Sequence, residues 1–257
     1  TATQAGKYFN PVIYTGAGGS QSITGVGFQP DWVWGQCRSV ATGSWLFDST
    51  RGATKQVESF STNAESTQPT MLTSFDSDGF SMGTDSAGNG NTRTFVAWNW
   101  KANGGTTTTN DASSTGIGTI DSVYQANTTA GFSIVTYTGS NTSSASFAHG
   151  LGVAPEMIII KARNLAAGFP VYHVPADVGG IRLNSTSAED NTNQSAWFPS
   201  APSSTVVNLG GGDEVNDNYN YLAYCFAGIE GYSKFGSYTG NGNVDGSFVY
   251  TGFRPAW

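Results

Sequence analysis

The sequence predicts an all-β protein made of tandem antiparallel β-sandwich units of the jelly-roll kind. Composition is the first reason: only 11% of the 257 residues are charged, aromatic residues reach 13%, and there are 34 glycines, which is typical of strands and turns. The second reason is the pattern, in which short apolar or alternating runs recur at spacings of roughly 8 to 15 residues between polar turns. No stretch of about a dozen residues keeps the apolar period of a helix.

A repeated motif is the third reason, and it predicts where the units lie. The motif consists of Tyr-Thr-Gly, a polar run, a bend that contains glycine and proline, and an apolar strand. Its three copies start at Tyr14, Tyr137 and Tyr238. The prolines of the bend are 125 and 100 residues apart, which is a spacing of domain size.

Four segments follow from this repeat. We expect a first β-sandwich unit over residues 1–104, a linker rich in Gly, Thr and Ser over 105–118, a second unit over 119–234 and the incomplete start of a third over 235–257. The third copy of the motif breaks off at Trp257. We therefore expect the uncut polypeptide to continue with a strand like that of residues 157–161.

The two complete units are expected to contain the same strands in the same order. In the first unit these are residues 32–34, 44–47, 71–75, 80–83 and 94–100, and in the second 132–137, 157–160, 169–173, 205–209 and 219–226. Residues 157–160 form a continuous apolar run, as expected of a strand that is covered on both faces. The connection at residues 76–79, Asp-Ser-Asp-Gly, favours a hairpin with a type I turn and a left-handed glycine.

Charge and cysteine content limit the possible partners. A net charge of −7 with only 11 Lys and Arg residues argues against nucleic acid and anionic membranes, which both attract clustered positive charge. No apolar run approaches the roughly 20 residues of a membrane helix, so we expect no membrane insertion. Cys37 and Cys225 fall at non-equivalent places in the repeat, which favours two lone buried thiols over a disulfide.

Five ordered motifs carry a resemblance to a known group of proteins. They are Gly-Phe-Gln-Pro-Asp-Trp-Val-Trp at 27–34, Phe-Asp-Ser-Thr-Arg-Gly-Ala at 47–53, Ser-Phe-Asp-Ser-Asp-Gly-Phe-Ser at 74–81, Phe-Val-Ala-Trp-Asn-Trp-Lys-Ala at 95–102 and Gly-Tyr-Ser-Lys-Phe-Gly-Ser-Tyr-Thr-Gly at 231–240. Together they resemble the repeated domain of uncharacterised virion proteins, of the structural or tail-fibre type, from tailed bacteriophages of marine and cyanobacterial hosts. The resemblance implies a lectin-like sandwich module and provides no catalytic residues to carry over.

The resemblance also sets the expected function. It implies a non-enzymatic structural or adhesion protein of the virion, assembled in the host cytoplasm and exposed on the particle, as a tail fibre or a surface fibre. The expected partners are the chain itself, as a homo-oligomer such as a trimer, and other virion proteins. A glycan on the host surface would be a further partner.

A carbohydrate-binding lectin is the first alternative function. Such a site needs an exposed aromatic ring on which a sugar stacks. We expect Trp32, Trp34 and Trp98 in the core and Trp45 and Trp197 at loop surfaces. The candidate glycan-binding residues are Trp45, Trp197 and Tyr172. Burial in the core is the competing explanation for all three.

A polysaccharide depolymerase is the second alternative. It needs two carboxyl groups about 5 to 10 Å apart, and the acids that qualify by type alone are Glu189, Asp190, Asp213, Glu214 and Asp217. Solvated loop acids are the simpler explanation. The sequence has no nucleophile elbow, zinc-protease or phosphate-loop motif. Because the two histidines, His149 and His173, are not repeated between the units, neither predicts a catalytic role.

Calcium is the one cofactor that the sequence suggests. Asp76 and Asp78 in one loop, and Asp213 and Asp217 in another, place several carboxylates among glycine and asparagine residues, and calcium prefers oxygen ligands of this kind. Neither loop follows the twelve-residue calcium-loop pattern. An ordinary turn is therefore the simpler explanation for residues 76–79.

Overall fold

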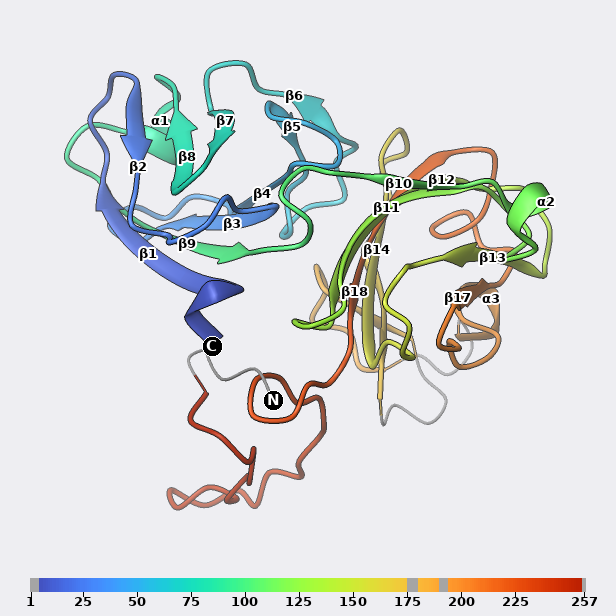
Figure 1. Cartoon of the computed structure of the whole chain (residues 1–257). Helices are drawn as coiled ribbons and strands as arrows, with labels where there is room; N and C mark the ends of the chain where they lie inside the picture. Colours follow the sequence, from blue (N-terminus) through green and yellow to red (C-terminus); the bar gives the residue numbers. More distant parts are fainter. Residues whose placement is uncertain (1–4, 175–179, 190–193, 256–257) are drawn as a thin grey trace.

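The computed structural model describes residues 5–174, 180–189 and 194–255 (Figure 1). The chain is nearly all-β, with 36% of its residues in strands and 5% in helices, and its sheets are antiparallel. The predicted fold class is confirmed at this level. In the described part of the chain, the helices are the 3-10 turn η1 (Ala5–Lys7) and the single turns α1 (Ser86–Asn89), α2 (Ala112–Thr115) and α3 (Gln194–Trp197).

The first unit contains nine strands in three sheets. The strands are β1 (Phe9–Thr15), β2 (Gln21–Ile23), β3 (Trp32–Cys37), β4 (Trp45–Asp48), β5 (Lys55–Gln56), β6 (Ser66–Thr67), β7 (Leu72–Asp76), β8 (Gly79–Met82) and β9 (Thr94–Trp100). The larger sheet has the order β1-β9-β3-β4, and β2-β8-β7 lies over one of its faces (Figure 1). A two-stranded sheet of β5 and β6 completes the unit.

The second unit is dominated by one sheet of seven strands. Its order is β10-β11-β12-β18-β14-β15-β16, and a separate pair joins β13 to β17. The strands are β10 (Thr108–Asn110), β11 (Ser122–Asn127), β12 (Phe132–Thr138), β13 (Ala145–Ala148), β14 (Met157–Ala162), β15 (Pro170–His173), β16 (Ile181–Arg182), β17 (Val206–Leu209) and β18 (Asn220–Phe226).

The segment expected to be a linker is partly regular structure. Strand β10 pairs with β11 at the edge of the large sheet, and α2 follows with Asp111 as its N-cap, whose carboxylate accepts the Ser114 amide N–H. Threonine suits an exposed edge strand, and aspartate is a preferred helix cap. For this reason a Thr-, Ser- and Asp-rich composition does not distinguish a linker from these elements.

The hairpin at residues 72–82 is tighter than expected. Asp76 on β7 pairs directly with Gly79 on β8, so Ser77 and Asp78 alone form the connection. Asp76 accepts hydrogen bonds from the Ser74 and Ser81 hydroxyls, at 2.8 and 2.7 Å. These bonds support the strands up to the turn. Because Asp76 and Gly79 are paired, two residues connect the strands, and the four-residue connection that the sequence favoured is wrong.

Equivalent strands of the two units pair in the same register. Trp32 on β3 faces Trp100 on β9, and 125 and 126 residues later Met157 on β14 faces Phe226 on β18. The tyrosine of the repeated motif stacks on the last strand in both units: the rings of Tyr137 and Tyr221 lie 5.1 Å apart with an interplanar angle of 14°. The internal repeat of the sequence is therefore also a repeat of strand pairing.

Buried asparagines explain why the loop after Tyr-Thr-Gly is alike in both units. Asn89 accepts the Ala17 amide N–H and donates to the Gly83 carbonyl, while Asn216 does the same for Ser140 and Gly210. The glycine of the motif is required as well, because a Cβ on Gly16 or Gly139 would overlap a backbone carbonyl oxygen of the facing loop. In both units, the recurring motif thus lies in a loop that is hydrogen-bonded to a second loop.

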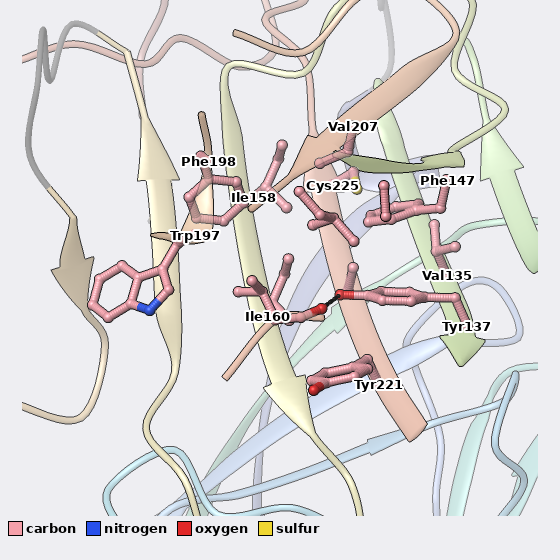
Figure 2. Packing of buried hydrophobic residues seen from close by; sticks show 14 of the residues in the cluster. Val135, Tyr137, Phe147, Ile158, Ile160, Trp197, Phe198, Val207, Tyr221 and Cys225 are labelled. Atoms are coloured by element: carbon pink, nitrogen blue, oxygen red, sulfur yellow. Dashed lines mark hydrogen bonds between the residues drawn. The ribbon is translucent and has the colours of Figure 1, made fainter. Parts of the chain in front are cut away.

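Apolar side chains form three clusters. One fills the first unit between its two larger sheets, and a second fills the second unit, where Tyr137 Oη donates to the Val215 carbonyl (Figure 2). The third cluster contains residues of both units, among them Trp32, Trp100 and Tyr224. Cys37 and Cys225 are both buried, free thiols.

Candidate functional site

The predicted glycan-binding residues do not form a surface site. Trp45 is 1% exposed, and Trp197 is 3% exposed and lies in the core of the second unit (Figure 2). The expectation that these two rings reach loop surfaces is wrong. Tyr172, which is half-buried, packs edge-to-face on Phe198 with 5.7 Å between the ring centres. The structure thus places Tyr172 and Trp197 around one core and Trp45 in the other unit.

Neighbouring residues give the physical reason for these burials. The Trp45 ring lies where a Cβ of Gly35 would stand, so glycine on the adjacent strand opens the space that the indole fills. The guanidinium of Arg182 lies 4.5 Å from the Trp197 ring centre, and this cation covers the face that a sugar would need. Burial of both aromatic rings in the core is therefore more favourable than their exposure to solvent.

Of the four aspartates proposed for calcium, Asp76, Asp78 and Asp217 use their carboxylates in local hydrogen bonds. Asp76 binds the two serines of its hairpin, and Asp78 accepts the amide N–H groups of Gly25 and Gly27, which lower the pKa of its carboxyl. Across residues 5–174, 180–189 and 194–255, no three His, Cys, Asp or Glu side chains form a group that could hold a metal ion.

The acidic residues of the loop at 213–217 also have local partners. The Asp213 carbonyl accepts the Tyr221 hydroxyl at 2.6 Å, and the Asp217 carboxylate accepts the amide N–H of Asn218. Glu214 forms an ion pair with Arg182 at 2.6 Å. Of the other acids considered for a depolymerase, Glu189 is exposed and Asp190 lies outside the described residues. None of these observations brings two carboxylates together around a cleft.

The junction between the two units is the most distinctive site of the described structure. Trp32 from the first unit lies at its centre. Its ring stacks on Tyr224 of the second unit at 4.3 Å and an interplanar angle of 27°, and lies 4.4 Å from Trp100. Phe132 and Phe226 complete the aromatic group. The large sheets of the two units therefore share one apolar core.

A chain of charged residues, two of them fully buried, runs beside this core. Arg51 donates to Asp48 at 2.6 Å and to Glu65 at 2.9 Å, and Arg163 of the second unit donates to the same Glu65 at 2.8 Å. The side chains of Asp48 and Arg51 are fully buried. We call Asp48, Arg51, Glu65 and Arg163 the ion chain.

The ion chain shifts the pKa values of its members. Burial by itself lowers the pKa of the Arg51 guanidinium, but the negative charges of Asp48 and Glu65 raise it above its ordinary value. Burial by itself raises the pKa of Glu65, whereas the hydrogen bond from Arg163 and the charge of Arg51 lower it. Arg51 and Glu65 are therefore both held in their charged forms, as a desolvated ion pair requires.

Two further hydrogen-bond donors of the second unit reach the first. Tyr224 Oη donates to Asp48 Oδ2 at 2.9 Å, and Lys161 Nζ donates to the Thr62 carbonyl at 3.1 Å and to the Ala167 carbonyl at 2.6 Å. Burial lowers the pKa of Lys161 to about 8. Each donor has a defined partner, so the junction fixes one relative position of the two sheets.

Asp31 fixes the point where the chain leaves the first unit. Its carboxylate accepts the amide N–H groups of Ala102, Gly104 and Gly105 at 2.7 to 2.8 Å. Glu156, at the equivalent place in the second unit, accepts the Gly228 amide N–H at 3.1 Å. The sequence contained a signal for this role, because an acid follows the bend proline in the first two of the three motif copies.

The two histidines are placed for structure. His149 is buried; its Nδ1 accepts the Leu151 amide N–H, and its Nε2 lies 3.2 Å from the Ser203 carbonyl. His173 lies edge-on to Phe235 with 6.1 Å between the ring centres. Neither contact pairs a histidine with a carboxylate or a hydroxyl, which is the arrangement that a Ser-His-Asp triad needs.

His149 predicts a pH dependence of stability. Burial lowers its pKa from 6.5 to about 4, so the unfolded chain binds a proton between these values before the folded chain does. The free energy of unfolding is therefore expected to fall as the pH falls from 6.5 towards 4, with a limiting slope of about 1.4 kcal/mol for each unit. Between pH 6.5 and 5.5, where the unfolded histidine is only partly protonated, the expected fall is about 1 kcal/mol. Urea unfolding at pH 6.5 and 5.5 measures this difference. A His149→Gln variant should lose that part of the slope, and an equal slope in both proteins would contradict the assignment.

Among the described residues, no helix is long and apolar enough to cross a membrane.

Comparisons with known proteins identify a family. No curated protein and no solved structure matches the chain significantly. Residues 4–257 match the model of a domain of unknown function, DUF7483, and this region includes both units and the junction between them. Because the match covers almost the whole sequence, the chain belongs to the DUF7483 family.

Proposed function

We propose that the chain is a non-enzymatic structural or adhesion module of a bacteriophage particle, in which two sandwich-like β units act as one stiff segment. The observation that carries this proposal is the junction. Its aromatic core joins the large sheets of both units, and the ion chain links loops of the two units. Domains that move relative to one another usually meet through smaller and more polar interfaces.

The ion chain favours stiffness in particular. A buried ion pair adds little net stability over an apolar pair of the same size, but its directional bonds penalise other arrangements. Glu65 receives hydrogen bonds from Arg51 of its own unit and Arg163 of the other. A rotation of one unit against the other would break the two hydrogen bonds between Arg163 and Glu65. This constraint suits a fibre or a particle surface that must keep its shape.

The motifs that resemble virion proteins supply much of this junction. Trp32 belongs to the motif at 27–34, Asp48 and Arg51 to the motif at 47–53, and Trp100 to the motif at 95–102. These residues provide the centre of the aromatic core and one end of the ion chain. The resemblance and the structural role therefore rest on the same residues. Under this proposal the partners are further copies of the chain, for instance in a trimer, and other virion proteins.

Cryo-electron microscopy of the native assembly that contains this chain tests the proposal. We expect both units, joined through Trp32 and the ion chain, in a symmetric fibre or on the surface of a particle. Light scattering of the isolated protein gives the number of copies that associate. A free monomer with a cleft lined by carboxylates would contradict the proposal and would favour a depolymerase instead.

A further inference from the structure

A cavity of about 390 Å³ lies where the two units meet the C-terminal segment. It opens beside the start of β1 and the end of β9 in the first unit, and beside the start of β12 and the end of β18 in the second. Figure 1 shows the C-terminal segment leaving β18 and running past this corner of the molecule. The volume falls within the range of small-molecule sites, about 300 to 1,000 Å³.

Equivalent aromatic residues of the two units form the apolar wall. Phe9 and Trp100 of the first unit lie 4.8 Å apart between ring centres, and Phe132 and Phe226 of the second unit lie 5.0 Å apart. All four rings line the cavity. Such a wall accepts a hydrocarbon chain or a flat ring, because the contact removes apolar surface of both partners from water.

The charged residues at the cavity are of one sign. Lys234 and Arg254 line it, whereas none of the described lining residues is Asp, Glu, Asn or Gln, in a chain whose net charge is −7. Lys234 Nζ donates to the Tyr250 carbonyl at 3.0 Å, which uses one of the three N–H donors of an ammonium group. Its other donors and the Arg254 guanidinium suit an anion.

This lining selects among ligand classes. Sugar sites commonly combine an aromatic ring with carboxylate or amide side chains that bind the sugar hydroxyls. The described lining has no such side chain, and its uncharged polar side chains are the hydroxyls of Tyr232, Ser233 and Thr251. An apolar body with one negative group matches both the rings and the cations. We infer that the cavity binds a small anionic amphiphile, a hydrocarbon body that carries a single carboxylate.

Titration calorimetry with decanoate, on the full chain, tests this inference, with 1-decanol and decyltrimethylammonium as neutral and cationic counterparts. We expect saturable binding of one decanoate per chain and much weaker binding of the two counterparts. In the Lys234→Gln/Arg254→Gln double variant, the loss of charge-assisted hydrogen bonds is expected to weaken decanoate binding by about tenfold or more.

The matched control is Lys55→Gln, since Lys55 lies on β5, away from the cavity lining. Its affinity for decanoate should equal that of the unaltered chain. Equal binding of decanol and decanoate would overturn the charge selection. An absence of saturable binding, or an unchanged affinity in the double variant, would overturn the site itself. These outcomes are independent of whether the chain is a virion component.

Discussion

Replacing Arg51 by methionine is expected to lower the free energy of unfolding by about 3 to 5 kcal/mol, the usual cost of removing one partner of a buried ion pair. The side chain of Arg51 is fully buried, and its removal would leave the equally buried Asp48 without its ion-pair partner. Glu65 would keep its pair with Arg163. The larger part of the loss should therefore come from Asp48, and urea unfolding followed by tryptophan fluorescence measures it.

Arg38→Met is the matched control for this variant, because Arg38 is exposed. It should change the free energy of unfolding by no more than about 0.5 kcal/mol. A second test is the double variant Arg51→Met/Asp48→Asn, which removes both charges and should recover part of the lost stability. If Arg51→Met alone lowered the free energy of unfolding by less than about 1 kcal/mol, water would have to reach Asp48, and the pair of Asp48 and Arg51 would not be shielded from solvent.

Ten of the strands followed from the sequence because each depends on local signals: β3, β4, β7, β8, β9, β12, β14, β15, β17 and β18. The alternating segments, the glycine and proline bends and the repeated Tyr-Thr-Gly motif are short-range patterns that act within a few residues. The continuous apolar run of β14 correctly indicated a strand covered on both faces: Ile158, Ile159 and Ile160 are all buried. These signals do not specify which sheet faces which.

The junction could not be predicted, since its contacts join residues far apart in the chain. Tyr224 reaches Asp48 across 176 positions, and Arg163 reaches Glu65 across 98. No local pattern pairs such residues. Trp45 and Trp197 were misplaced for a related reason, because the burial of a ring depends on a neighbouring strand that carries glycine, or on a cation that covers the ring. Asp31 and Glu156, which follow the bend proline in the first two motif copies, are the polar residues for which the sequence did contain a pattern.

The third motif copy illustrates the same limit. Tyr238 and Phe248 correspond to Tyr137 and Phe147 of the second unit, where the two rings stack at 4.5 Å in the core. In the C-terminal segment, however, Tyr238 is 71% and Phe248 89% exposed, and residues 234–255 contain no strand. The motif therefore encodes a strand only where partner strands are present, which agrees with the marginal stability of isolated strands in water.

Trp32→Ala should have an effect of similar size to that of Arg51→Met, a loss of about 3 to 5 kcal/mol, because truncating a buried tryptophan removes its contacts and leaves a cavity. The location of the loss should differ. Trp32 is the aromatic residue through which the first unit stacks on Tyr224 and Phe132 of the second, so its removal loosens the attachment between the units as well as the first unit itself.

Trp45→Ala separates these two effects. It is the same change at an equally buried indole, but Trp45 packs inside the first unit, in the cluster between the two larger sheets of that unit. Both variants should unfold at lower urea concentrations than the parent chain. Only Trp32→Ala should also broaden the distribution of interatomic distances obtained from small-angle X-ray scattering of the folded protein. It alone should make the connection at residues 103–107 more sensitive to proteases, since only in this variant do the units lose their shared core. If the two variants scattered alike and were cleaved alike, the shared core would not be what holds the units in one orientation, and the ion chain alone would have to do so.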